Sequence, residues 1–174
     1  MEYVVGCTHL DDTGILAYRN QNSVEEMNRS ILERWNNKIT RDDYVYVLGD
    51  FAVRHVEHWQ AALNGTKLLV KGNHDPVGIY RAGFADIVES KSLILFNDET
   101  EEPDTVFLSH YPYASWPGKS RGCFHLHAHS HGKGSAVRAR RTGSRIADVS
   151  IDGWPSWPVT LLEVISILKK GSEA

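Results

Sequence analysis

A short apolar run passes directly into four polar residues in the stretch Lys67-Leu68-Leu69-Val70-Lys71-Gly72-Asn73-His74-Asp75. Two similar segments precede it, Cys7-Thr8-His9 and Gly49-Asp50, and each follows an apolar run of its own. Open α/β sheets bind their ligands beyond the carboxyl ends of the strands. We therefore expect these polar residues to meet at one edge of a sheet.

Two histidine-containing segments extend this pattern in the second half of the chain. His110 follows the apolar run Val106-Phe107-Leu108-Ser109, and His129 and His131 alternate in the segment 128–131. Alternate residues of an extended segment point to the same side, so both imidazoles can face the same ions. Divalent metals that activate water need such nitrogen and oxygen donors, with a shared carboxylate for which Asp50 is suited. The set predicts a two-metal hydrolytic centre.

Composition limits the class of protein. The 174 residues, 41% of them hydrophobic, fit one domain over 1–174. A net charge of -3 gives no global attraction to nucleic acid or membranes, and no segment approaches the ~20 apolar residues of a membrane span. Two cysteines make no disulfide framework. We expect a soluble, cytoplasmic protein without a membrane partner.

The first half alternates strands and helices. Strands are expected at 3–7, 44–48 and 67–71, and a polar loop at 8–21. Ser23 and Glu26 form a capping box that predicts a helix ending near Lys38, and a shorter helix is expected at 55–63. This alternation favours a parallel sheet with crossover helices.

The second half is mostly strand-like. We expect strands at 87–96, 105–109, 123–127, 146–151 and 159–167, with a solvated acidic loop at 98–104. Strand following strand suggests a second sheet, largely antiparallel or mixed, packed on the first.

The ordered set of metal-ligand-like segments resembles the calcineurin-like metallophosphoesterase superfamily over nearly the whole chain. Three stretches resemble its small bacterial and phage members in particular: Val47-Leu48-Gly49-Asp50-Phe51, Leu108-Ser109-His110-Tyr111-Pro112 and Trp116-Pro117-Gly118-Lys119-Ser120-Arg121-Gly122. The resemblance implies an α/β fold, an αββα four-layer sandwich of two mixed β-sheets flanked by helices. It also implies two metals roughly 3.5–4 Å apart.

The resemblance assigns ligands to both metals. The first metal would be held by Cys7, His9, Asp50 and His131. The second would be held by Asp50, Asn73, His110 and His129. His74 would act on the leaving-group oxygen as a catalytic residue, oriented by Asp75.

The implied activity is that of a metal-dependent phosphoesterase. We expect a phosphodiesterase that hydrolyses a nucleotide-type or other small phosphodiester through a hydroxide bridging two divalent metals, drawn from manganese, zinc, iron or nickel. A phosphomonoesterase is the alternative within the same chemistry. A metal-binding or regulatory module with impaired catalysis is the alternative from another class.

Two positions depart from the family pattern. Cys7 replaces the usual aspartate and Ala128 replaces the usual glycine. A thiolate at position 7 would bias the first site toward zinc or iron. Alternatively, Cys7 is an ordinary small buried residue that leaves this site weakened.

Tyr113 and Arg121 are candidate substrate contacts. Tyr113 and Arg121 would belong to a rim over the metals, where Arg121 contacts a substrate phosphate or is simply solvated. Gly118-Lys119-Ser120 is not predicted to be a phosphate loop, because Tyr113 occupies the upstream position at which that motif requires a glycine.

The loop 132–144 and the residue that follows it carry four arginines. These are Arg138, Arg140, Arg141 and Arg145. We interpret this loop as a solvated hairpin tip, so nucleic acid is not the favoured partner. For His125 and His127 we expect a packed or ligand-orienting role.

Overall fold

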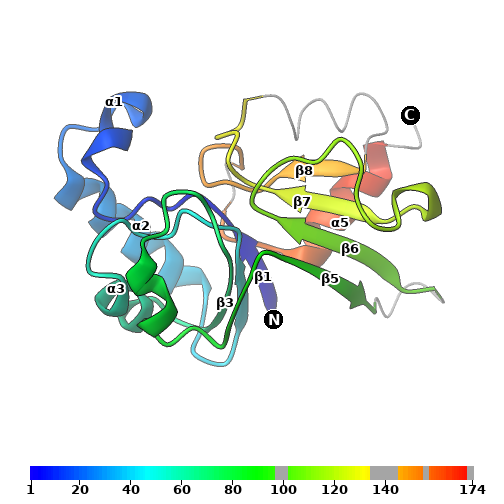
Figure 1. Cartoon of the computed structure of the whole chain (residues 1–174), viewed down its shortest axis with the longest axis horizontal. Coiled ribbons are helices and arrows are strands. Elements are labelled where there is room, and N and C mark those ends of the chain that lie inside the picture. The colour runs from blue at the N-terminus through cyan, green and yellow to red at the C-terminus, as the bar shows by residue number, and fades with distance from the viewer. Residues whose placement is uncertain (97–101, 134–144, 155–156, 172–174) are drawn as a thin grey trace.

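The computed structural model describes residues 1–96, 102–133, 145–154 and 157–171, which form two β-sheets with helices around them (Figure 1). The first sheet has the order β4-β3-β2-β1-β9 and the second the order β5-β6-β7-β8. The expectation of an α/β fold with two sheets is thereby confirmed.

The first sheet is parallel except at one edge. It contains β1 (Glu2–Val5), β2 (Tyr44–Val47), β3 (Thr66–Val70), β4 (Asp86–Val88) and β9 (Val159–Thr160). β1 to β4 run parallel to one another, and β9 pairs antiparallel with β1. Most residues of β1, β2 and β3 are buried, as is typical of parallel strands that are covered on both faces.

The second sheet is mixed, as one of the sequence alternatives predicted. It contains β5 (Ser90–Leu95), β6 (Asp104–Ser109), β7 (Phe124–His127) and β8 (Ile146–Asp148). β5 pairs antiparallel with β6, whereas β6, β7 and β8 are parallel. Of the predicted acidic loop 98–104, residues 98–101 lie outside the described residues.

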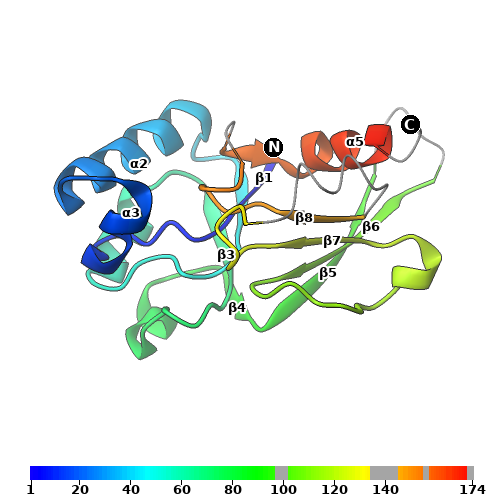
Figure 2. The ribbon, with the colours of Figure 1, turned by 90° about the horizontal axis from the view of Figure 1, so that it is seen from above.

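Two helices cover the first sheet on the side away from the second sheet, as Figure 2 shows. They are α2 (Val24–Lys38) and α3 (Val56–Ala62). The Ser23 side chain accepts a hydrogen bond from the Glu26 N–H, so the predicted N-cap is confirmed. The buried face of α2 includes Met27, Ile31 and Trp35.

The segment before α2 is more structured than the expected polar loop. It forms the 3-10 turn η1 (Thr13–Ile15) and the short helix α1 (Leu16–Arg19). The Asp12 carboxylate caps η1 by accepting a hydrogen bond from the Gly14 N–H at 2.8 Å.

The strand predicted at 159–167 is wrong beyond its first two residues, because Leu161–Gly171 forms helix α5. Thr160 and Glu163 make a reciprocal capping box: the Glu163 carboxylate accepts from the Thr160 N–H at 2.7 Å, and the Thr160 hydroxyl accepts from the Glu163 N–H at 3.2 Å. The buried side chains of α5 recur at helical spacing, namely Leu161, Val164, Ile165 and Leu168. α5 packs against β1, β8 and β9.

Both sheets contribute to one continuous apolar core. They come together at an isolated parallel bridge between Gly6, just after β1, and Ser150, just after β8. A Cβ at Gly6 would overlap the Ala128 side chain, which shows how closely the strand ends approach here. The carboxyl ends of β1, β2, β3, β6 and β7 therefore open onto the same region.

No helix in the described part of the chain has the length and apolar character needed to cross a membrane.

Candidate metal centre

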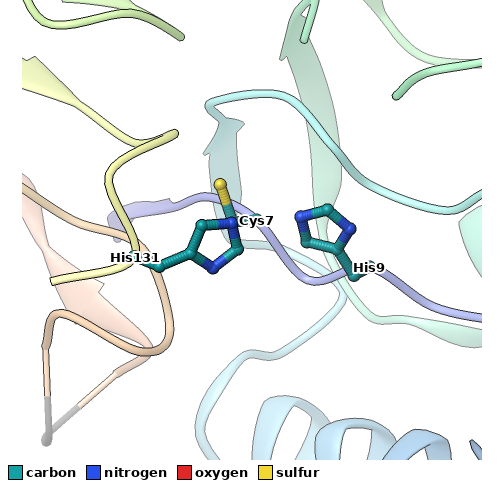
Figure 3. A group of neighbouring side chains, drawn as sticks. All are labelled: Cys7, His9 and His131. Carbon is teal, nitrogen blue, oxygen red and sulfur yellow. The ribbon is translucent and has the colours of Figure 1, made fainter. Parts of the chain in front are cut away.

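The residues predicted as metal ligands gather at these strand ends. Cys7 and His9 follow β1, Asp50 follows β2, and Asn73 follows β3. His110 directly follows β6, and His129 and His131 follow β7. Figure 3 shows Cys7 and His9 beside His131, which comes from the other sheet.

The His110 ring sits where several electron-pair donors converge. Its Nδ1 lies 2.9 Å from the Leu48 carbonyl oxygen, which can only accept, so the neutral ring presents a lone pair at Nε2. That Nε2 lies 3.0 Å from Asn73 Oδ1, 3.2 Å from His129 Nδ1 and 3.4 Å from Asp50 Oδ2. Such a cluster of donors is suited to a divalent cation.

Two further imidazoles each have one ring nitrogen held by a carboxylate. His9 Nδ1 lies 2.8 Å from Asp12 Oδ2, and His131 Nδ1 lies 2.7 Å from Asp152 Oδ2. Metal-binding histidines typically use one nitrogen for such a contact and the other for the metal. His9 Nε2 fits this pattern, because it is buried without a hydrogen-bond partner and lies 3.5 Å from Asp50 Oδ2.

The neutral forms of the His9 and His129 rings are favoured by their surroundings. Burial is the largest effect on His9 and lowers its pKa, against the opposing hydrogen bond to Asp12. Burial also lowers the pKa of His129, and the neighbouring His110 adds to that effect. Neutral imidazole is the form that binds a metal.

Cys7 lies within the donor set. Its Sγ is within 4.8 Å of donor atoms of His9 and His131, and likewise of Asp50 and His110. The His129 N–H donates a hydrogen bond to this sulfur at 3.1 Å. Burial, followed by the charge of Asp50, raises the pKa of the thiol well above its usual value. A thiolate here therefore requires a nearby cation.

The backbone is strained throughout this region. Five of the seven predicted ligands have left-handed φ values: Cys7 (53°), His9 (52°), Asp50 (51°), His129 (62°) and His131 (48°). Each non-glycine residue in such a conformation costs about 1–3 kcal/mol, and strain of this kind clusters at functional sites. Ala128 is not among the residues with left-handed φ values and adds no such strain.

Asp75 has a different role from the predicted one. Its buried carboxylate accepts backbone hydrogen bonds from Gly72 (2.7 Å), Phe51 (2.8 Å) and Asp50 (3.1 Å). It thus ties together the turns that follow β2 and β3, and does not orient the His74 ring. His74 is exposed, with its ring centroid 5.3 Å from that of His9, and its backbone N–H donates to Asp50 Oδ1 at 2.8 Å.

The two predicted substrate contacts are not at the centre. Arg121 belongs to the 3-10 turn η3 (Lys119–Arg121), which precedes β7, whereas His129 follows β7. Figure 1 shows β7 running from the η3 turn toward the middle of the molecule. The Tyr113 ring lies 5.8 Å from that of His125, over the second sheet. The predicted rim formed by 116–122 is therefore wrong.

Tyr111 occupies the position that Tyr113 was expected to hold. Its ring centroid is 4.6 Å from that of His129 and 4.8 Å from that of His110, and its hydroxyl donates to Asn73 Oδ1 at 3.2 Å. Its position directly after His110 is the sequence feature that could have predicted its place at the centre.

Arg19 also belongs to the centre, although no sequence pattern indicated it. Its guanidinium forms two hydrogen bonds with Asp152, at 2.8 and 2.9 Å. It also donates to the carbonyl oxygens of Cys7 (2.6 Å) and Thr8 (2.9 Å). Arg19 thereby connects the turn after β1 with the carboxylate that orients His131.

The remaining histidines and arginines lie elsewhere. His125 Nε2 contacts the Ser109 hydroxyl at 2.8 Å, and burial lowers the pKa of His125 to about 3. His127 donates from Nδ1 to the Ala128 carbonyl at 2.8 Å, in the packed role that the sequence suggested. Arg145 donates to the Gly122 carbonyl before β7, and Arg138, Arg140 and Arg141 lie outside the described residues.

Comparisons with known proteins identify relatives by sequence but no family. No family model matches the chain. An uncharacterized protein of Methanocaldococcus jannaschii is 35% identical over 83 residues, a match that spans 44% of this chain and only 47% of that protein. The gene 66 protein of Mycobacterium phage L5 is 26% identical over 84% of both chains.

One solved structure has the same overall fold. The crystal structure of a protein of unknown function from Aquifex aeolicus superposes with a TM-score of 0.73, covering 96% of this chain and 98% of that one. The two sequences are 21% identical, so the likeness concerns the fold alone.

The close approach of Gly72 to the centre can be tested by adding one methyl group. A Cβ at Gly72 would overlap the Asp50 carboxylate and lie 2.9 Å from the His110 ring, whereas a Cβ at Gly78 would meet nothing within 4 Å. We expect Gly72→Ala to lower the free energy of unfolding by about 1–3 kcal/mol, measured by urea denaturation of metal-free protein. Gly78→Ala is the control, and equal stabilities of the two variants would contradict the crowding.

His125 should make stability depend on pH. Between a folded pKa of about 3 and the usual 6.5, the unfolded chain binds a proton that the folded chain does not. Stability should therefore fall with decreasing pH through this window, by at most about 1.4 kcal/mol per pH unit from this residue. Urea denaturation from about pH 7 to 4.5 should show a shallower slope for His125→Gln than for the wild type. The exposed His58→Gln is the control, and an unchanged slope in His125→Gln would refute this origin.

Proposed function

We propose that this protein is a two-metal phosphoesterase of the calcineurin-like superfamily that acts on a phosphodiester. The observation that carries the proposal is the close grouping of Asp50, Asn73 and three imidazoles, which come from the ends of strands in both sheets. The three imidazoles are those of His9, His110 and His129. The buried, unpartnered His9 Nε2 supports it independently.

The donor set suits two divalent ions. Cys7, His9, Asp50 and His131 would hold the first, and Asp50, Asn73, His110 and His129 the second. The outer contacts from Asp12, Asp152 and the Leu48 carbonyl agree with this assignment, because each fixes one ring nitrogen and frees the other. The four-layer αββα form of the fold is part of the same proposal; it is supported by two mixed sheets, with α2 and α3 over the first and α5 packed against β8 of the second.

Two such ions, when bound, would activate water and neutralise charge on the phosphate; manganese, zinc, iron and nickel are the candidates. The protein itself contributes positioning. Asp75 holds the turns that carry Asp50 and Asn73, so these two donors keep their separation. His74, exposed beside His9, would donate a hydrogen bond or a proton to the leaving oxygen.

Charge near the centre favours a diester over a monoester. A monoester dianion would need cationic side chains in addition to the metals. Among the described residues, Arg19 is committed to Asp152, and the Lys133 ammonium lies over the Tyr18 ring at 4.7 Å. A diester carries one charge, which the metals alone would neutralise.

The proposal predicts hydrolysis that depends on added metal. Chelator-stripped protein should not hydrolyse an aryl phosphodiester, and manganese, zinc, nickel or iron added singly should restore turnover. An aryl phosphomonoester measured in parallel distinguishes the two esterase activities. Folded protein that binds metal but turns over neither ester would instead favour the binding or regulatory module.

His74→Ala should separate catalysis from metal binding. Loss of a positioned proton donor typically lowers the rate about 100- to 10,000-fold. Metal content, measured by elemental analysis, should stay at the wild-type value because the His74 ring is not among the proposed ligands. His58→Ala, on the exposed face of α3, is the matched control. Loss of metal from His74→Ala would reassign it as a ligand.

A further inference from the structure

We infer that the two halves of this centre differ in chemical hardness, and that Cys7 with His9 and His131 forms a sulfur–nitrogen site that selects a thiophilic divalent ion such as zinc. This inference rests on the proposed metal centre and extends it, because it assigns a different preference to each ion. The second half, with oxygen and nitrogen donors only, would accept harder ions such as manganese.

The position of the sulfur is the first observation. Cys7 Sγ and one nitrogen each of His9 and His131 lie within 4.8 Å of one another, a spacing that a single ion can bridge with modest side-chain adjustment. Figure 3 shows the three side chains grouped where the turn after β1 meets the turn after β7. The backbone N–H of His129 points at the sulfur from 3.1 Å, a contact that stabilises negative charge on it.

The second observation is the unpartnered nitrogen of His9. Its side chain is only 3% exposed, and Nε2 has no hydrogen-bond partner among the described residues. A buried polar atom without a partner costs about 1–3 kcal/mol, so such atoms require an explanation. Because Nδ1 is already held by Asp12, Nε2 is left facing the group that contains Cys7.

The third observation is that hydrogen bonds from Arg19 hold the Cys7 side of the centre in position. Arg19 fixes the Cys7 carbonyl directly and fixes His131 through Asp152. The Arg19 side chain is 7% exposed, and its pairing with Asp152 balances its charge within the protein. One guanidinium thus anchors the backbone of Cys7 and, through Asp152, the ring of His131.

The proposed second metal site contains no sulfur. Its proposed donors are the Asp50 carboxylate, the Asn73 amide oxygen and the rings of His110 and His129. The chain has only one other cysteine, Cys123, which precedes β7 and is therefore at the opposite end of that strand from His129. Cys123 Sγ is directed to the Phe124 carbonyl at 3.4 Å. Any thiolate bound to metal in this centre must therefore come from Cys7.

Cobalt(II) provides a direct test, because a cobalt–thiolate bond gives a near-ultraviolet charge-transfer band that nitrogen and oxygen ligands do not give. Chelator-stripped Cys123→Ser protein, in which Cys7 is the sole thiol, would be titrated with cobalt. We expect the band to appear, to be lost on adding zinc, and to persist in excess manganese. Cys7→Ser and Cys7→Asp should both lose the band, and Cys7→Asp should bind manganese at the first site.

Two outcomes would overturn the inference: bound cobalt without the band in Cys123→Ser, or displacement of the band by manganese as readily as by zinc. Circular dichroism would establish that the variants are folded. Should the Cys7 variants not fold, the spectrum of Cys123→Ser still decides the question. Hydrolysis without a thiolate band would refute this inference but support the proposed function. A thiolate band without hydrolysis by any metal would support this inference but refute the proposed function.

Discussion

The architecture depends on holding the polar side chains that follow strands of both sheets close to one another. The Nε2 of His110 faces an amide oxygen, a carboxylate oxygen and another imidazole nitrogen at 3.0–3.4 Å. Lone pairs at these separations repel unless a cation lies among them. The same region contains the buried carboxyl of Asp75, whose pKa is raised first by burial, with the charge of Asp50 adding to the effect. The fold concentrates donors whose mutual repulsion a bound cation would relieve.

Such an arrangement must be stabilised from outside the centre. Five left-handed residues cost about 1–3 kcal/mol each, and the apolar core shared by both sheets supplies the opposing free energy. The parallel strands make this possible, because each ends beside its neighbour and can place one turn at the common edge. In the sharp turns, three backbone N–H groups are outside the hydrogen-bond pattern of the sheet. The Asp75 carboxylate accepts a hydrogen bond from each of them.

Sequence patterns were sufficient where a local rule and the tertiary environment agreed. The Ser23 cap and the strand ends carrying Asp50 and Asn73 are of this kind. The strand prediction over 159–167 is wrong for most of its length because this stretch is apolar and rich in β-branched residues and so also fits a strand, although Thr160 and Glu163 form a capping box. The position of Arg121 differs from the predicted one because a residue before a strand lies at the opposite edge of the sheet from a residue after it, and Arg121 precedes β7. Arg19 acts through long-range contacts with no sequence spacing, so only the tertiary structure reveals it.

In the proposed metal centre, a thiol at position 7 instead of a carboxylate would make metal binding depend on proton release. An aspartate is already ionised near neutral pH, so metals of any hardness can bind it without displacing a proton. The buried thiol of Cys7 has a pKa well above its usual value, mainly because of burial. Binding an ion through this sulfur must therefore expel a proton, and only a metal–sulfur bond of sufficient strength offsets that cost. A hard ion forms a weak bond to sulfur and leaves the cost uncompensated. Discrimination between ions would then arise twice, from the affinity of the thiolate and from the cost of generating it, and affinity at this half of the centre would rise with pH.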